Sequence, residues 1–502
     1  METVLVALYF SVLLALCAYG GHRAHLVLLC LRHRRRLAKT ALPAAGLGDK
    51  PMPAVTIQLP LYNEATVVER LLDAVATMDY PRELLEIQVL DDSTDETRQL
   101  AAAKIAALQS RGLDIQHVRR PNRVGYKAGA LDYGQGFAKG ELIAIFDADF
   151  IPQPGFLRDV VGHFADQGVG MVQTRWGHLN RSRSGFTEVQ ALMLDGHHLV
   201  ENRGRFGAGL MFNFSGTGGV WRKQAIVDAG GWQHDTLTED LDLSYRAQMA
   251  GWRFVYRPDV VTPAELPEDM AAFRAQQYRW AKGTVQTARK LLATIWKGNL
   301  GLTQRIEASF HLLPHFAYPL MVLLSVLLLP ALVLLPATDV GTMLLVDLPL
   351  CLGATGSLAS FYITAEKAQG RSAWRAVYRL PALIALGAGM APHLTRAVLH
   401  GLRQMAGEFV RTPKRGEKQG RYRQATQLPY AELALATVSV TSVAASIHTH
   451  HWFAAPFAAL FAVGYSYVAW RVVAEQWESR RGVTSRGASV QEVGAAEVAR
   501  AA

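Results

Sequence analysis

The sequence predicts an α/β domain inserted between transmembrane α-helices. Half of its 502 residues are hydrophobic, but these concentrate at the start of the chain and in its C-terminal third, while the middle resembles a soluble domain. Within residues 52–300, short apolar runs alternate with helical patterns, which is typical of a parallel sheet covered by helices. We therefore expect one soluble domain flanked by membrane segments.

The first apolar stretch, residues 4–31, is long enough to span the ~30 Å hydrocarbon core of a membrane. The alternative interpretation is a cleaved leader. A leader usually begins with positive charge, whereas this stretch begins Met-Glu-Thr. Basic residues follow it, and such loops stay on the cytoplasmic side. We expect a transmembrane helix over 1–31 with its N-terminus outside, then a basic cytoplasmic linker over 32–51. In a bacterium this membrane would be the inner one.

The soluble part contains apolar runs that predict β-strands at 55–59, 86–90, 114–118 and 142–146. Helical patterns lie between the first pairs of these runs, at 64–77 and 95–110. The sequence has no GxxxxGK[ST] motif, and no GxGxxG follows the first strand. Neither a P-loop nor an ordinary dinucleotide site is therefore predicted.

Residues 309–475 are expected to form transmembrane and interfacial helices. The segments expected to cross the membrane are 316–336, 343–364, 433–447 and 453–473. The segment 380–399 is apolar but contains two prolines, a histidine and an arginine. If it crossed, the basic loop 401–424 would lie outside, so we expect an interfacial or re-entrant helix, five spans in all and a cytoplasmic C-terminus. We expect residues 476–502 to form a disordered tail.

Charge and cysteine usage exclude some classes of protein. The net charge of +10 comes largely from loops beside apolar segments, which favours contact with a membrane surface. A basic stripe with aromatic residues is missing, so we expect no nucleic-acid partner. Cys17, Cys30 and Cys351 all lie in apolar stretches without metal-ligand spacing, so neither disulfides nor a zinc site is expected.

The stretch 142–150 joins an apolar strand to the triplet Asp147-Ala148-Asp149. Ligands of open α/β sheets bind outside the carboxyl ends of strands, and alternate residues of an extended chain share a face. Asp147 and Asp149 could therefore hold a hard divalent cation that also binds phosphate oxygens. The alternative is an acidic turn without a ligand.

Other strand ends carry weaker signals. Asp91 and Asp92 follow the second strand, where they could bind a base or ribose, or where their neighbours could cap the next helix. Tyr62 and Glu64 follow the first strand and suit a pocket rim, although ordinary turns use the same residues. Lys127 lies among glycine and alanine, where its ammonium could approach a phosphate or merely be solvated.

Two later stretches complete the set. The sequence Thr238-Glu239-Asp240 opens a helix, where the dipole favours acids and Thr238 suits the N-cap, but one acid could also act as a general base. In residues 273–284, a glutamine, an arginine and a tryptophan share one broad helical face. That face could bind a phosphate and a sugar ring, or it could belong to an amphipathic helix beside the membrane.

The order of these elements resembles that of the processive family 2 glycosyltransferases of the cellulose synthase superfamily. Their signature of D, DxD, TED and QxxRW is matched by Asp91/Asp92, Asp147-Ala148-Asp149, Thr238-Glu239-Asp240 and Gln276-Gln277-Tyr278-Arg279-Trp280. The sequence around these motifs is most similar to that of the CslA and CslC branch of mannan and glucan synthases. The resemblance covers residues 52–300 closely and implies a Rossmann-like GT-A domain on the cytoplasmic side of the membrane.

The resemblance also implies roles for single residues. Asp240 would be the general base, and Asp147 and Asp149 would hold Mg²⁺ or Mn²⁺ with the diphosphate. The nucleotide-sugar site would comprise Tyr62, Glu64, Asp91, Asp92, Lys127, Asp147, Gln276 and Arg279, and the acceptor site Trp280, Phe212, Thr217 and Glu239. A gating loop would include Phe409, Thr412 and Lys414, although Arg411 stands where the family pattern has valine.

These roles together imply an inverting, metal-dependent, processive transferase. It would extend a β-linked glucan, mannan or glucomannan from UDP-glucose or GDP-mannose, and its protein partners are left open. One alternative is an enzyme of the same fold that adds a single sugar to a lipid. Another is a transporter or scaffold with an inactive transferase domain, against which the intact acidic positions argue.

Overall fold

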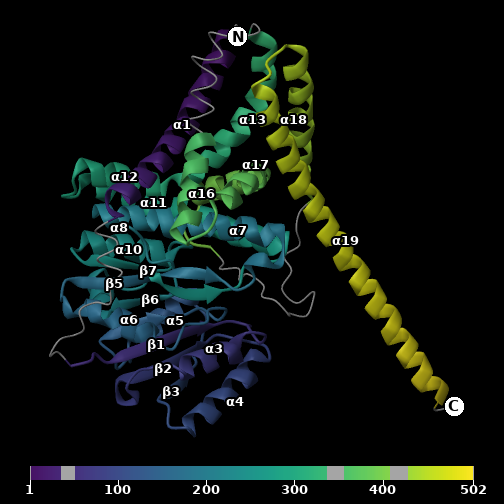
Figure 1. Cartoon of the computed structure of the whole chain (residues 1–502). Helices are drawn as coiled ribbons and strands as arrows, with labels where there is room; N and C mark the ends of the chain where they lie inside the picture. Colours follow the sequence, from purple (N-terminus) through teal and green to yellow (C-terminus); the bar gives the residue numbers. More distant parts are fainter. Residues whose placement is uncertain (1, 35–50, 336–354, 408–427, 501–502) are drawn as a thin grey trace.

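The computed structural model describes residues 2–34, 51–335, 355–407 and 428–500, and places an α/β domain against a group of long helices (Figure 1). The side chains of α19 are described as far as Glu478. The expected linker 32–51 and the expected span 343–364 therefore lie partly outside the described residues, as does the loop 401–424.

A seven-stranded mixed sheet forms the centre of the α/β domain, in the order β3-β2-β1-β4-β6-β5-β7. Its strands are β1 (Val55–Leu61), β2 (Leu85–Asp91), β3 (Ile115–Val118), β4 (Leu142–Ile145), β5 (Val169–His178), β6 (Gly219–Arg222) and β7 (Arg253–Ala264). The four predicted strands are confirmed, and they pair in parallel. The sheet is not parallel throughout, because β6 runs antiparallel to both β4 and β5.

Helices cover both faces of this sheet, and the main core packs β1, β2 and β4 against α3, α4 and α6. They are α3 (Val68–Ala76), α4 (Thr97–Gln109), α5 (Tyr126–Gln135), α6 (Phe156–Val161), α7 (Gly185–Gly196), α8 (Arg203–Ala208), α9 (Lys223–Asp228) and α10 (Glu239–Met249). Short 3-10 turns occur at η1 (Arg82–Leu84), η2 (Gly162–Ala165) and η3 (Arg181–Arg183), and a π-helix, η4 (His197–Asn202), continues α7. The helices expected at 64–77 and 95–110 are confirmed as α3 and α4.

The remaining helices are α1 (Glu2–Arg32), α11 (Met270–Lys297), α12 (Leu302–Leu312), α13 (Ala317–Leu334) after the turn η5 (Pro314–Phe316), α16 (Ser357–Ala368), α17 (Ala373–Arg403), α18 (Tyr430–His448) and α19 (Ala454–Arg500). Five candidate spans occur in the described part of the chain: Glu2–Arg32, Pro314–Leu334, Ala373–Arg403, Tyr430–His448 and Ala454–Glu478. The membrane part comprises these candidate spans and α16, whereas α11 and α12 lie between it and the α/β domain (Figure 1). Four of the candidate spans coincide with predicted spans.

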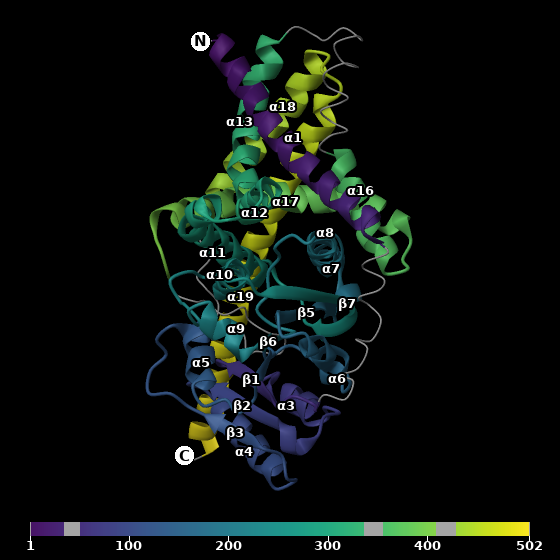
Figure 2. The ribbon, with the colours of Figure 1, turned by 90° about the vertical axis from the view of Figure 1, so that its left-hand side faces the viewer.

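The fifth candidate, α17, contains the segment 380–399 that we expected to lie at the interface. Figure 2 shows α17 lying crosswise to α13 and α18, between them and the α/β domain. In its most apolar window 61% of the residues are buried, against 11% for α1. Length and composition would allow α17 to span, and its interfacial placement remains a prediction.

The C-terminus differs from our expectation. We expected residues 476–502 to be disordered, whereas α19 continues as one helix to Arg500 and extends beside the α/β domain (Figure 1). The segment contains three glycines, which disfavour a helix, but it also contains six alanines and no proline, and it follows a helix that is already formed. Extending an existing helix is much easier than nucleating a new one, which is the physical reason for the difference.

Contacts from the membrane part hold α11 in place. The carboxylate of Glu475 on α19 accepts hydrogen bonds from the backbone N–H groups of Met270 and Ala271, at 2.8 and 3.1 Å. Asp269 caps the next free group, the N–H of Ala272, at 2.7 Å. Three of the first N–H groups of α11 therefore have acceptors, two of them supplied by another helix.

Candidate active site

The site is centred on an ion pair at the carboxyl end of β4. The Lys127 ammonium, at the start of α5, lies 2.5 Å from Oδ1 of Asp147 and donates to the carbonyl oxygen of Gly216 at 2.9 Å. The backbone N–H of Asp147 donates to the Thr217 hydroxyl at 2.9 Å. Residues from β4, α5 and the loop before β6 are thus tied together at one sheet edge.

A small pocket of about 110 Å³ opens beside this ion pair. Its carboxylates are Asp147, Asp149, Glu239, Asp240 and Glu265, and its permanent cations are Lys127 and Arg279. Glu265 is partly offset by Arg70, whose guanidinium lies 2.8 Å away. The pocket therefore concentrates more negative than positive charge, which favours a ligand that brings positive charge with it.

Burial and, second to it, the neighbouring Glu239 carboxylate together raise the pKa of Asp240 to about 7. Burial also raises the pKa of Glu239. Although burial alone would lower the pKa of Lys127, the Asp147 carboxylate beside it raises that pKa, so the lysine stays charged. A carboxyl group with a pKa near neutrality is suited to general-base chemistry.

Asp147 and Asp149 can accept a divalent cation. Asp149 is buried, whereas the Asp147 side chain is one-third exposed toward the pocket. The described residues contain no group of three or more His, Cys, Asp or Glu side chains that could hold a metal by themselves. Two carboxylates suit Mg²⁺ or Mn²⁺, because these ions fill the rest of their coordination shells with substrate oxygens and water.

A much larger cavity, of about 1060 Å³, leads away from the pocket into the membrane part. The residues Trp176, Ser215, Thr238, Asp240, Gln276 and Trp280 line both spaces. Farther along, the lining comes from α1, α13 and α19, with residues such as Phe10, Leu328 and Phe457. A chain-like molecule whose end reaches Asp240 could therefore extend toward the membrane helices.

The QxxRW motif lies on α11 as predicted, and Gln276, Arg279 and Trp280 all line the pocket. Trp280 faces Trp176, with 6.5 Å between the ring centroids. Sequence reasoning missed Trp176, because β5 carries no motif that points to a binding site. The two indole rings offer apolar surfaces on which a sugar ring could stack.

The predicted acceptor residues Phe212 and Thr217 do not reach the pocket. Phe212 is 1% exposed and packs against Phe206, Phe254 and Tyr256, and Thr217 is fully buried behind Asp147. The side chains between them reach the cavity instead: Asn213 and Ser215 line it. Oδ1 of Asn213 and Oγ of Ser215 are buried and have no hydrogen-bond partner within the described residues.

The predicted nucleoside-binding residues lie at the ends of β1 and β2, outside the pocket lining. Asp91 accepts from His117 at 2.8 Å, and Asp92 accepts from Arg120 at 2.8 Å. Tyr62 lies 3.3 Å beneath the Arg123 guanidinium, and Glu64 is buried. Because β1 and β2 follow β4 in the sheet, a nucleotide could extend over these strand ends, and these roles remain predictions.

The expected N-cap at Thr238 does not form, and the expected gating residues lie outside the described part of the chain. Thr238 precedes α10, but its hydroxyl lies 3.1 Å from that of Thr287 and does not cap the helix. Tertiary packing against α11 therefore replaces the expected local bond. The gating residues Phe409, Thr412 and Lys414 lie outside the described residues, and their role stays a prediction.

Gln286 of α11 connects the catalytic segment to the end of α17, and no motif indicated it. Its side-chain oxygen accepts from the N–H of Leu237 at 3.0 Å. Its amide nitrogen donates to the carbonyl oxygens of Gln404 and Ala406 at 2.8 and 2.7 Å. The side chain is fully buried, so the position of the segment leading to Asp240 depends on these three bonds.

Comparisons with known proteins agree with this geometry. Residues 53–283 match the family model described as glycosyltransferase like family 2. The chain is 35% identical over 393 residues to glucomannan 4-beta-mannosyltransferase 1 of Oryza sativa subsp. japonica, which covers 74% of this chain and 71% of that protein. It is 40% identical over 254 residues to glucomannan 4-beta-mannosyltransferase 2 of Arabidopsis thaliana, covering 50% of this chain and 48% of that protein.

Among solved structures, the chain resembles the mannosyltransferase PcManGT from Pyrobaculum calidifontis in complex with GDP-Man and Mn²⁺. The two share 23% identity with a TM-score of 0.48, over 71% of this chain and 97% of that one.

The substitution Gln286→Glu tests the bridge between Leu237 and the end of α17. It keeps an oxygen for the Leu237 N–H but turns a second oxygen toward two carbonyl groups. We expect a loss of about 1–3 kcal/mol of folding stability, measured as a lower Tm of the purified protein in detergent.

The matched control is Gln304→Glu on α12. The oxygen of Gln304 accepts from the N–H of Gly301 at 3.1 Å, and the change also preserves this bond. Its Tm should stay close to that of the wild type, because an ordinary surface substitution changes the free energy of unfolding by no more than about 0.5 kcal/mol. Equal Tm values for the two variants would contradict the bridging role.

Proposed function

The chain belongs to glycosyltransferase family 2, in the branch of the glucomannan 4-beta-mannosyltransferases, and on that premise we propose that it is a membrane-embedded polysaccharide synthase. It is an integral membrane protein whose α/β domain has the GT-A fold. In the proposal it transfers hexosyl units from a nucleotide sugar to the end of a growing β-linked chain. The observation that carries the proposal is that the acidic pocket and the large cavity share lining residues, Asp240 and Trp280 among them.

We propose GDP-mannose as the first donor and a mannan or glucomannan as the product. The relatives in rice and Arabidopsis are named for mannosyl transfer to glucomannan, which supports this choice. UDP-glucose is the second donor to consider. The proposed orientation places the α/β domain in the cytoplasm, where nucleotide sugars are made, and the N-terminus of α1 outside.

Asp240 takes the proton in the proposed reaction. Asp240 lines both the pocket and the cavity, so it can contact the hydroxyl of an acceptor that stacks on one of the two indole rings. The hydroxyl oxygen attacks the anomeric carbon from the face opposite the diphosphate, the bond to the diphosphate breaks, and the proton passes to Asp240. One displacement inverts the anomeric centre, so an α-linked donor yields a β-linkage.

Lys127 and Arg279 hold the leaving diphosphate, since both cations face the pocket. Asp147 and Asp149 would hold the divalent cation, which when bound neutralises charge on the diphosphate. Lys127 also fixes Asp147, so one side chain can serve both the phosphate and the metal-binding carboxylate.

A second candidate is transfer of one sugar to a lipid. The membrane end of the cavity is lined by apolar side chains such as Leu324, Leu332 and Phe461, which suit an acyl or prenyl chain as well as a passing polymer. The volume of the cavity, about 1060 Å³, and its lining from Asp240 to the membrane helices favour the polymer, because a polymer would occupy both its polar and its apolar parts.

Product analysis decides between these functions. Membrane vesicles that contain the protein would receive labelled GDP-mannose or UDP-glucose, with Mg²⁺ or Mn²⁺. We expect GDP-mannose to yield a high-molecular-weight product that β-mannanase degrades. Products that all partition into organic solvent as glycolipids would overturn the polymer proposal, and incorporation from UDP-glucose alone would overturn the donor assignment.

The base assignment predicts a pH dependence. Asp240 must be ionised to accept a proton, and its pKa is raised to about 7, so kcat/KM should rise with pH through this region and fall below it. Asp240→Asn should lower kcat by about 10²–10⁴-fold, the contribution of a general base.

Glu239→Gln provides the comparison for this profile. Removing the Glu239 charge lowers the pKa of Asp240, so the rising limb should move to lower pH. A profile that is the same in wild type and Glu239→Gln, together with full turnover by Asp240→Asn, would exclude Asp240 as the base.

A further inference from the structure

His178 lies at the end of β5 and lines the small pocket together with Lys127, Asp147 and Arg279. It does not belong to the lining of the large cavity, whereas Trp176 and Leu194 line both spaces. The imidazole therefore borders the part of the site where the donor would bind, and not the large cavity proposed for the acceptor.

Asp195 on α7 holds this imidazole. Its Oδ1 lies 3.2 Å from Nε2 of His178, and both side chains are almost completely buried, at 1% and 4% exposure. Bonds from His178 and Arg181 outweigh the effect of burial and keep the pKa of Asp195 below its usual range, so it is a carboxylate. A carboxylate only accepts hydrogen bonds, so Nε2 carries a proton, and in the tautomer with that single proton Nδ1 is an acceptor.

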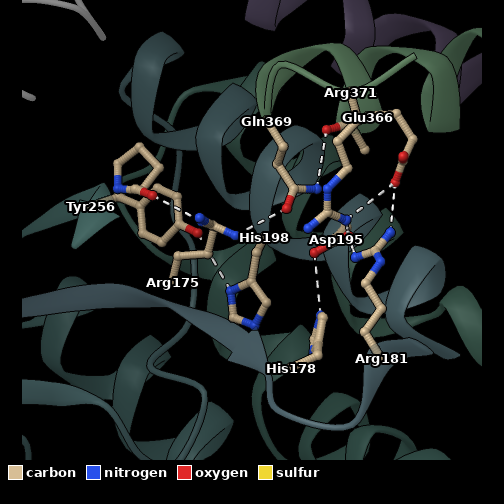
Figure 3. Close-up of polar contacts among 11 residues, drawn as sticks. Arg175, His178, Arg181, Asp195, His198, Tyr256, Glu366, Gln369 and Arg371 are labelled. Carbon is tan, nitrogen blue, oxygen red and sulfur yellow. Dashed lines mark hydrogen bonds and ion pairs between the residues drawn. The ribbon is translucent and has the colours of Figure 1, made fainter. Parts of the chain in front are cut away.

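An ion-pair network fixes Asp195 in turn, as Figure 3 shows. Arg181 contacts both Asp195 and Glu366 of α16, the latter at 2.7 Å, and Arg371 lies 3.8 Å from each of the two carboxylates. The alternating charges join β5 and α7 of the α/β domain to the end of α16. Asp195 is buried within this network and cannot itself reach a substrate.

Nδ1 of His178 has no hydrogen-bond partner in the part of the chain that the structure describes, and the ring borders the pocket. An acceptor nitrogen needs a ligand that donates. Diphosphate oxygens bound to cations carry no proton to donate at neutral pH, whereas each sugar hydroxyl does. The diphosphate also has two cations of its own in Lys127 and Arg279.

We propose that His178 is a donor-sugar-binding residue, whose Nδ1 accepts a hydrogen bond from a hydroxyl of the transferred hexose. Asp195 is the positioning residue that holds the ring in the required tautomer. His178, Arg181 and Arg371 contact Asp195 directly, whereas Glu366 contacts only the two arginines of this network. The inference rests on the proposed function, because it assumes that a nucleotide sugar occupies the pocket.

Two substitutions separate binding from support. In His178→Gln the amide nitrogen takes the place of Nε2, so the bond to Asp195 can persist while the acceptor at Nδ1 is lost. In His178→Asn the amide takes the place of Nδ1, so a polar group still faces the sugar while Asp195 loses its partner. If the histidine only supports Asp195, the glutamine variant should keep more of the nucleotide-sugar affinity. If it binds the sugar as proposed, the asparagine variant should keep more.

Calorimetry on the full chain in detergent with Mg²⁺ compares each nucleotide sugar, GDP-mannose or UDP-glucose, with its free nucleoside diphosphate. We expect His178→Gln to lower the affinity for the nucleotide sugar about tenfold and the affinity for the nucleoside diphosphate less than about twofold. His178→Asn should lower the affinity for the nucleotide sugar less than His178→Gln does. Equal losses for both ligands, or stronger sugar binding by His178→Gln than by His178→Asn, would overturn the proposal.

The matched control is Glu366→Gln, which alters the same network without touching His178. It should leave the ratio of the two affinities unchanged, and a changed ratio would contradict the assignment to His178. If the glutamine variant does not fold, Asp195→Asn gives the same readout, with selective loss expected and equal loss contradicting it. Wild type that binds neither nucleotide sugar would reject the proposed function itself.

Discussion

The concentration of carboxylates around Lys127 is the constraint on which the site depends. Asp147, Asp149, Glu239 and Asp240 come from a strand end and a helix start that are distant in sequence, and they meet in a pocket of about 110 Å³. Like charges in a buried space repel one another, and the protein offsets this with Lys127 and Arg279 and through the raised pKa of Asp240. The same arrangement leaves room for a cation and a diphosphate.

Helices of the membrane part help to position this charged site, and they also line the large cavity beside it. Glu475 of α19 binds the N-terminus of α11, which carries Arg279 and Trp280, and Gln286 of α11 binds the segment before Asp240. The network around Asp195 ties α7 to α16 in a similar way. The catalytic geometry therefore depends on helices that lie outside the sheet, and some of the residues that these helices carry line both the small pocket and the large cavity.

The sequence predicted the features that depend on neighbouring residues. The strands β1 to β4, the helices α3 and α4, and the placement of Asp147 and Asp149 at a strand end follow from local periodicity. The antiparallel β6 could not be predicted, because its four residues acquire a direction only by pairing with β4 and β5. Within residues 212–217, local pattern could not tell that Asn213 and Ser215 face the cavity while Phe212 enters the core. Trp176, His178 and Gln286 had no motif, and their partners are distant in sequence.

Metal binding in the presence of a nucleoside diphosphate tests the account most directly. Mn²⁺ binding to the full chain with GDP or UDP can be followed by electron paramagnetic resonance in wild type, Asp147→Asn, Asp149→Asn and Glu265→Gln. The account predicts that the two Asp variants weaken Mn²⁺ binding by at least about tenfold, while Glu265→Gln, whose carboxylate already pairs with Arg70, binds as wild type does. Unchanged Mn²⁺ affinity in Asp147→Asn and Asp149→Asn would contradict it.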